Sequence, residues 1–90
     1  MTRQELETAS EHLESAARAS ADADVSERLS RVAQKLTVWL AADSGPDHGQ
    51  LARIENRLHS LRDDVDASLR DDITTAHELV REYRSGVEGV

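Results

Sequence analysis

Two long stretches of the chain contain neither glycine nor proline, and this feature favours helix over any other regular structure. The stretches cover residues 2–42 and 50–85, and the segment between them holds Gly45, Pro46 and Gly49. Gly45 is suited to end a helix, and Pro46 prevents that helix from continuing. We therefore predict one all-helical domain in residues 1–90, with a helical half at 2–43, a loop at 44–49, a helical half at 50–85 and a frayed tail at 86–90.

Residues suited to capping stand at the ends of both halves. Thr2 with Glu5, and Asp47 with Gln50, have the spacing of a capping box, in which each side chain accepts a hydrogen bond from the other residue's backbone. Gly86 follows the second half, where a C-cap is expected.

Apolar residues recur every three or four positions in both halves, so each half has one continuous apolar stripe. Both stripes follow a heptad pattern with a run of four-residue steps, a stutter, near Val25 and near Val65. The first stripe comprises Leu6, Ala9 or Ser10, Leu13, Ala17, Ala21, Val25, Leu29, Val32, Leu36 and Trp39. The second comprises Leu51, Ile54, Leu58, Leu61, Val65, Leu69, Ile73, Ala76, Val80 and Tyr83.

Folding the chain back at the loop brings the two stripes together along their whole length. Trp39 then faces Leu51, Ala17 faces Ile73, and the two stutters meet, as two helices that supercoil together require. The favoured prediction is therefore a long antiparallel α-hairpin, with helices about 55–60 Å long. The alternative is four shorter helices, with the halves broken near Asp24 and Asp64, because Asp is a poor residue inside a helix. In that case Asp24 with Glu27 would cap a new helix.

A hairpin of two helices leaves the flanks of its apolar stripe in water. Val38, Leu40 and Leu79 widen that stripe beyond the width that one partner helix covers. We therefore expect two copies of the chain to pair as a homodimer and to complete a four-helix bundle.

The net charge of the chain indicates the solvent in which the protein works, and it identifies no ligand. Eighteen acidic residues face eleven basic ones, of which only Lys35 is lysine, and the net charge is -7. This composition is typical of proteins that work in concentrated salt, where screening weakens repulsion among carboxylates. There is no excess of basic residues, no cysteine and no membrane-length apolar run. We expect a cytoplasmic protein that binds neither nucleic acid nor membranes.

Four histidines are candidates for metal ligands. In the hairpin, His12 and His77 lie at one level near several glutamates, and histidines with carboxylates can hold a divalent metal. No established metal-binding motif accompanies them, so we predict no metal site and keep His12 and His77 as weak candidates. A rod also offers no catalytic cleft, and no glycine-rich phosphate loop is present. We expect no enzymatic activity, no catalytic residue and no cofactor.

Two charged groups in the second half are expected to be solvated surfaces. The acidic group comprises Asp63, Asp64, Asp66, Asp71 and Asp72. The basic group comprises Arg53, Arg57, Arg62 and Arg70. Interleaved acidic residues cancel the basic group, and no aromatic residues accompany it, which argues against nucleic-acid binding. The two aromatic residues, Trp39 and Tyr83, are expected to serve the core or a dimer contact.

The whole layout resembles a group of small, uncharacterised haloarchaeal helical proteins, classed as a domain of unknown function. The likeness rests on two helical halves rich in Leu, Arg and Glu, the Gly45-Pro46 linker and the closing stretch AHELVREYR at residues 76–84. The resemblance implies no activity, cofactor or site residue. From the residues we expect a non-enzymatic, homo-oligomeric helical scaffold or adaptor that acts through helix–helix contacts in a high-salt cytoplasm. The alternative is a small acidic regulatory module that binds a basic protein partner or a divalent metal.

Overall fold

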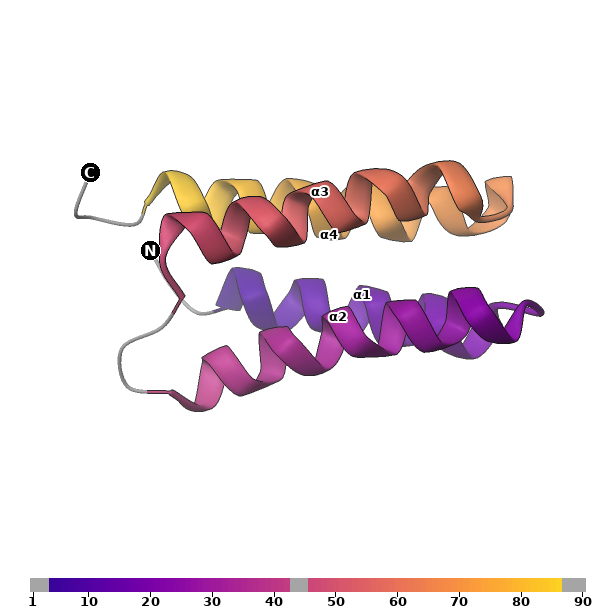
Figure 1. Ribbon diagram of the computed structural model, residues 1–90, viewed down its shortest axis with the longest axis horizontal. Coiled ribbons are helices and arrows are strands. Elements are labelled where there is room, and N and C mark those ends of the chain that lie inside the picture. Colours follow the sequence, from indigo (N-terminus) through magenta and orange to yellow (C-terminus); the bar gives the residue numbers. More distant parts are fainter. Residues whose placement is uncertain (1–3, 43–45, 87–90) are drawn as a thin grey trace.

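The computed structural model describes residues 4–42 and 46–86, and these residues form helices and no strand (Figure 1). The helices are α1 (Gln4–Ala19), α2 (Ala23–Ala41), α3 (His48–Asp64) and α4 (Ala67–Ser85). The predicted all-α class is confirmed, in its form with four shorter helices. The favoured continuous hairpin is wrong, because each half of the chain breaks and folds back on itself.

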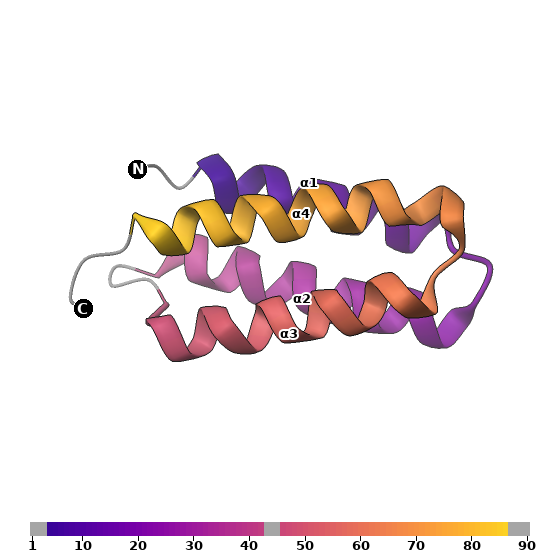
Figure 2. The ribbon, with the colours of Figure 1, turned by 90° about the horizontal axis from the view of Figure 1, so that it is seen from above.

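The helices form two layers, with α1 beside α2 in one and α3 beside α4 in the other (Figures 1 and 2). The α1–α2 and α3–α4 turns lie at the same end of the bundle, and consecutive helices run antiparallel. Each helix contacts its two neighbours around the bundle, but α2 and α3 contact each other far less than the other three pairs do. The molecule measures 39 × 21 × 18 Å, well short of the rod expected from an unbroken hairpin.

The first half breaks at Asp22, which is the N-cap of α2. Its carboxylate accepts hydrogen bonds from the backbone N–H of Asp24 at 2.9 Å and of Val25 at 3.3 Å. Two donors that the start of a helix leaves unpaired are thereby satisfied. The sequence placed the break within two residues of its position but assigned the cap to Asp24, which lies inside α2.

The second half breaks over only two residues, Val65 and Asp66. Val65 has extended backbone and is 5% exposed, so the turn itself contributes a side chain to the core. Asp66 is the N-cap of α4, but its side chain makes no capping hydrogen bond. This break therefore depends on apolar packing at Val65 rather than on side-chain capping.

The capping difference between the two turns predicts a difference in stability. Asp22→Ala is expected to lower the free energy of unfolding by about 1 kcal/mol, because it removes both capping hydrogen bonds. The matched control is Asp66→Ala, which loses no capping bond and is expected to cost a few tenths of a kcal/mol at most. Chemical denaturation of both variants measures the difference, and equal losses would show that Asp22 does not stabilise the turn.

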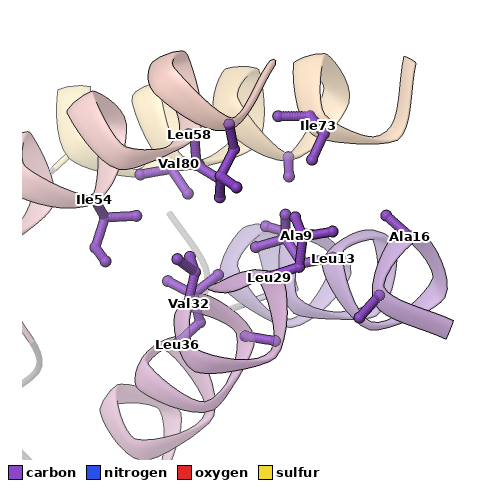
Figure 3. Packing of buried hydrophobic residues seen from close by; sticks show 14 of the residues in the cluster. Ala9, Leu13, Ala16, Leu29, Val32, Leu36, Ile54, Leu58, Ile73 and Val80 are labelled. Carbon is purple, nitrogen blue, oxygen red and sulfur yellow. The ribbon is translucent and has the colours of Figure 1, made fainter. Parts of the chain in front are cut away.

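Folding back lets the chain complete its own core. The buried apolar residues of all four helices form one cluster, and Figure 3 shows side chains of α1 and α2 pointing toward those of α3 and α4. Both predicted apolar stripes are buried, with two exceptions. Ala21 is exposed in the connection between α1 and α2, and Tyr83 is partly exposed. An unbroken hairpin would have to bury the same flanks against a second chain, at the entropy cost of association.

Other predictions about the helix ends have mixed outcomes. The capping box of Asp47 and Gln50 is confirmed, with Asp47 accepting from the Gln50 backbone at 2.8 Å. Gly86 is the C-cap of α4, as predicted, although its backbone is right-handed. Thr2, Gly45 and most of the predicted tail lie outside the described residues. None of the described helices is long and apolar enough to cross a membrane.

Candidate functional site

The pair α2 and α3 stands apart, and the sizes of its buried side chains favour a wider spacing than in the α1–α2 pair. The α1–α2 contact contains small side chains such as Ala9, Ala16 and Ala33, and the Ser10 hydroxyl lies 3.4 Å from the Ala33 carbonyl oxygen across it. The apolar side chains that α2 and α3 direct into the bundle are large by comparison. They are Leu29, Val32, Leu36 and Trp39 from α2, with Leu51, Ile54, Leu58 and Leu61 from α3. Small residues let helix axes approach closely, whereas large residues hold them apart.

Three hollows that share Arg57 lie between α2 and α3. These two helices are the ones nearest the viewer in Figure 1. The volumes of the hollows are about 290, 90 and 340 Å³, and Arg57 of α3 lines all three. We call this surface the α2–α3 groove. From α2 it is lined by Arg28, Arg31, Val32, Gln34, Lys35, Val38 and Trp39, and from α3 by Gln50, Arg53, Ile54, Arg57 and Leu61.

The groove is basic although the chain as a whole is acidic. Five of the eleven basic residues line it, and no Asp or Glu among the described residues does so. Sequence analysis considered Arg53 and Arg57 only as part of a ridge whose charge was cancelled. None of the interleaved acidic residues lines the groove, however, although Asp64 pairs with the groove residue Arg28, and α2 adds Lys35 to the same surface. The groove was missed because the hairpin packed these two segments tightly against each other, with Trp39 facing Leu51, whereas in the structure α2 and α3 barely touch.

Two of the groove's cations already have partners. Arg28 pairs with Asp64 at 3.0 Å and so bridges the start of α2 to the end of α3, while Arg31 pairs with Glu27 at 3.5 Å on the exposed surface of α2. Lys35, Arg53 and Arg57 make no ion pair with any carboxylate of the described residues. Their charges are therefore available to a ligand, since little internal pairing would have to be broken.

The groove also offers apolar surface. Val38 is 64% exposed, the one large apolar side chain of the described residues classed as exposed, and it lines the same hollow as Lys35 and Arg57. Trp39 is only 8% exposed, so its indole forms part of the wall and packs into the core. The predicted core role of Trp39 is confirmed.

A separate polar cluster joins α3 to α4. The Glu55 carboxylate, 15% exposed, accepts a hydrogen bond from Arg84 at 2.8 Å and lies 3.4 Å from His77 Nε2. Arg84 Nε also lies 3.5 Å from His48 Nδ1, while His48 Nε2 is buried and has no partner in the described part of the chain. Glu55 of α3 thus contacts both Arg84 and His77 of α4, and this cluster ties the two helices together. This cluster could not be predicted from the sequence, because it joins α3 to α4, and the unbroken hairpin keeps these two segments in one helix.

The two weak metal candidates have different carboxylate partners. His12 of α1 contacts Asp72 of α4 at 2.9 Å, and His77 contacts Glu55. The hairpin placed His12 and His77 at one level, but the structure gives each its own interhelical contact. No group of three or more His, Cys, Asp or Glu side chains within residues 4–42 and 46–86 is arranged to hold a metal ion.

The predicted acidic group is split by the turn between α3 and α4. Asp64 pairs with Arg28, and Asp72 contacts His12, so two of its members tie helices together. Asp63, Asp66 and Asp71 are exposed, in agreement with the prediction of a solvated surface.

One carboxyl has a shifted pKa. Burial, followed by contact with the carboxyl of Glu82 on α4, raises the pKa of Glu5 on α1 above its usual value. A group whose pKa is raised in the folded state favours folding at low pH, and that contribution is lost as the pH rises through the folded pKa. Glu5→Gln is therefore expected to raise the melting temperature slightly near pH 7, with the gain disappearing in acid.

Thermal melts across a pH series measure this effect. Glu7→Gln is the control, because Glu7 is exposed in the same first turn and shows no such contact. If both variants behave alike at every pH, the contact between Glu5 and Glu82 carries no energetic weight.

These features define a small all-α protein with a four-helix bundle and a basic surface groove. A family model matches residues 1–86, and the chain belongs to that family, DUF7553, a family of unknown function. The resemblance to an uncharacterised domain is thereby confirmed, while the haloarchaeal source stays a prediction. Comparison with curated proteins and with solved structures found no match.

Proposed function

We propose that this protein is a non-enzymatic helical adaptor that binds a partner through helix–helix contacts in the α2–α3 groove. The observation that carries the proposal is the groove itself, where two neighbouring helices of the bundle barely touch and leave exposed apolar and cationic side chains between them. Grooves between helices receive partner helices through apolar anchors at i, i+3, i+4 and i+7 spacing. The adaptor role predicted from the sequence thus gains a specific surface.

Photo-crosslinking in cells that make the protein naturally tests this role. A photoreactive residue at Val38, inside the groove, is expected to form an adduct whose crosslinked peptide maps to a helical segment of another protein. Ser15 of α1 is the matched control, because it is exposed and does not line the groove. The adaptor proposal fails if Val38 gives no adduct or if Ser15 gives the same adducts.

The predicted homodimer is untested and its original reason no longer applies, so we propose the single-chain bundle as the functional unit. The dimer was expected to complete a core that the single chain already closes. A dimer would therefore have to form on the outer surface of the bundle, as a second function of the same scaffold. A cytoplasmic location in concentrated salt is retained as part of the proposal, supported by the net charge of -7.

The alternative, an acidic module that binds a basic partner or a divalent metal, has weaker support. Two members of its acidic group contact basic or histidine side chains of this chain, Asp64 with Arg28 and Asp72 with His12. The α2–α3 groove is basic, so it favours an acidic partner and not a basic one.

A further inference from the structure

The α2–α3 groove has the chemistry to select its partner, and this inference rests on the adaptor function proposed above. Lys35, Arg53 and Arg57 line the groove from both sides without a carboxylate partner among the described residues. In a protein with a net charge of -7, such a concentration of cations is local. An anionic ligand would satisfy these charges, whereas a basic ligand would add to their repulsion.

The apolar walls of the groove distinguish among anionic ligands. Val32, Ile54 and Leu61 line the hollows together with the cations, and Val38 stands exposed beside them. An amphipathic helix can cover both kinds of surface at once, with its apolar residues on the walls and its acidic residues on the cations. A single-stranded nucleic acid gains much of its affinity by stacking its bases on aromatic side chains. Trp39 does not supply one, because it is only 8% exposed.

A second copy of this chain does not fit the groove well. Two grooves placed face to face would bring their cations together, which is unfavourable. The acidic helix of another copy, α1, carries Glu7, Glu11 and Glu14 on its exposed surface, but its apolar residues Leu6 and Leu13 are already buried in its own bundle. It therefore has no apolar face left to insert.

We infer that the occupant of the α2–α3 groove is an amphipathic helix of a partner protein whose apolar stripe is flanked by Asp or Glu. The apolar stripe rests on the walls of the groove. The flanking carboxylates pair with Lys35 and Arg53 on one hollow and with Arg57, which lines all three.

Trp39, the single tryptophan of the chain, makes binding directly measurable because it lines the groove. Three helical peptides of about 18 residues, long enough to run the length of α2, would share one apolar stripe and contain no tryptophan. They would differ only in carrying Glu, Gln or Lys beside the stripe. Each is titrated against the full protein, with Trp39 fluorescence as the readout, at moderate and at molar KCl.

The Glu peptide is expected to bind about tenfold more tightly than the Gln peptide, as three exposed ion pairs would give, and the Lys peptide most weakly. The preference should shrink at molar KCl, because salt screens charges on the surface. Arg57→Glu is expected to abolish the preference for the Glu peptide. Arg81→Glu is the matched control, because Arg81 is exposed on α4 outside the groove and its reversal should leave the preference unchanged.

Circular dichroism checks that each variant is folded. Arg57→Gln removes the charge without reversing it, so it should reduce the preference for the Glu peptide by a smaller factor than Arg57→Glu does. Equal binding of all three peptides would contradict the inference that the partner helix is acidic, but it would still agree with the adaptor role. If a single-stranded oligonucleotide binds and none of the peptides does, the acidic partner helix is overturned and the ligand of the groove is a polyanion. If no peptide changes Trp39 fluorescence, the acidic helix is rejected, and crosslinking at Val38 decides separately whether the groove binds any helix.

Discussion

Leu13→Ala is expected to lower the free energy of unfolding by about 3 kcal/mol and the melting temperature by roughly 15 °C. Leu13 is fully buried at the middle of α1, the helix that packs tightly against both α2 and α4. Truncation removes apolar contacts and leaves a cavity, because close-packed helices on both sides cannot collapse completely into the space. Chemical and thermal denaturation in molar KCl measure the loss.

Val38→Ala is the control for this prediction. It also truncates an apolar side chain to Ala, removing two carbons where Leu13→Ala removes three, but Val38 is 64% exposed and lies outside the buried core. Its effect on stability is expected to stay within about 0.5 kcal/mol. A large loss for Val38→Ala, or a small one for Leu13→Ala, would mean that the core is not where the structure places it.

Glu55→Ala is expected to cost about 2 kcal/mol, because it leaves Arg84 without its carboxylate in a partly buried site. Two helices lose their shared polar tie, since His77 contacts the same carboxylate. Glu55→Gln keeps a hydrogen-bond acceptor but not the charge, so it should lose about half as much. Chemical denaturation of the unchanged protein, Glu55→Ala and Glu55→Gln under the same conditions measures these losses in the free energy of unfolding.

The matched control is Glu27→Ala, which breaks an ion pair that is exposed on both sides. Glu27 and Arg31 lie 3.5 Å apart and are both more than half exposed, so their separation should cost less than about 0.5 kcal/mol. Equal costs for Glu55→Ala and Glu27→Ala would contradict the assignment of Glu55 as a structural tie.

The composition of the core could be predicted from the sequence, because it depends on periodicity alone. The residues of both stripes are buried almost throughout, and the stutters near Val25 and Val65 fall where the helices break. A stutter marks a change in the direction of the apolar stripe, and both a supercoil and a turn can absorb that change. The sequence pattern therefore left two architectures open, and the less favoured one formed.

The α1–α2 and α3–α4 turns depend on local interactions that the spacing of apolar residues does not reveal. Asp22 caps α2 through two backbone N–H groups, and Val65 fills the core from within a two-residue connection. Once both halves fold back, one chain buries the surfaces for which the unbroken hairpin needed two chains. This difference removes the main argument for a dimer.

The candidate site could not be predicted, because the hairpin packed the segments of α2 and α3 tightly together, whereas in the structure these two helices barely touch. Lys35 of α2 and Arg57 of α3 are far apart in the sequence, and Arg57 lies close to the acidic Glu55. The groove appears because α2 and α3 stand apart, and apolar periodicity does not show which pair of neighbouring helices packs less closely. A signal was present in the exposed Val38, which was noted only as widening the apolar stripe.

The central claim is that one chain closes the four-helix bundle whose α2–α3 side forms the groove. Small-angle X-ray scattering, coupled to size exclusion and light scattering in molar KCl, tests it most directly. The bundle predicts a particle of 10.0 kDa whose radius of gyration is only slightly above the 12.3 Å of its Cα atoms. A particle of twice that mass with a radius of gyration of about 17 Å or more, as expected for hairpin helices about 57 Å long, would contradict it.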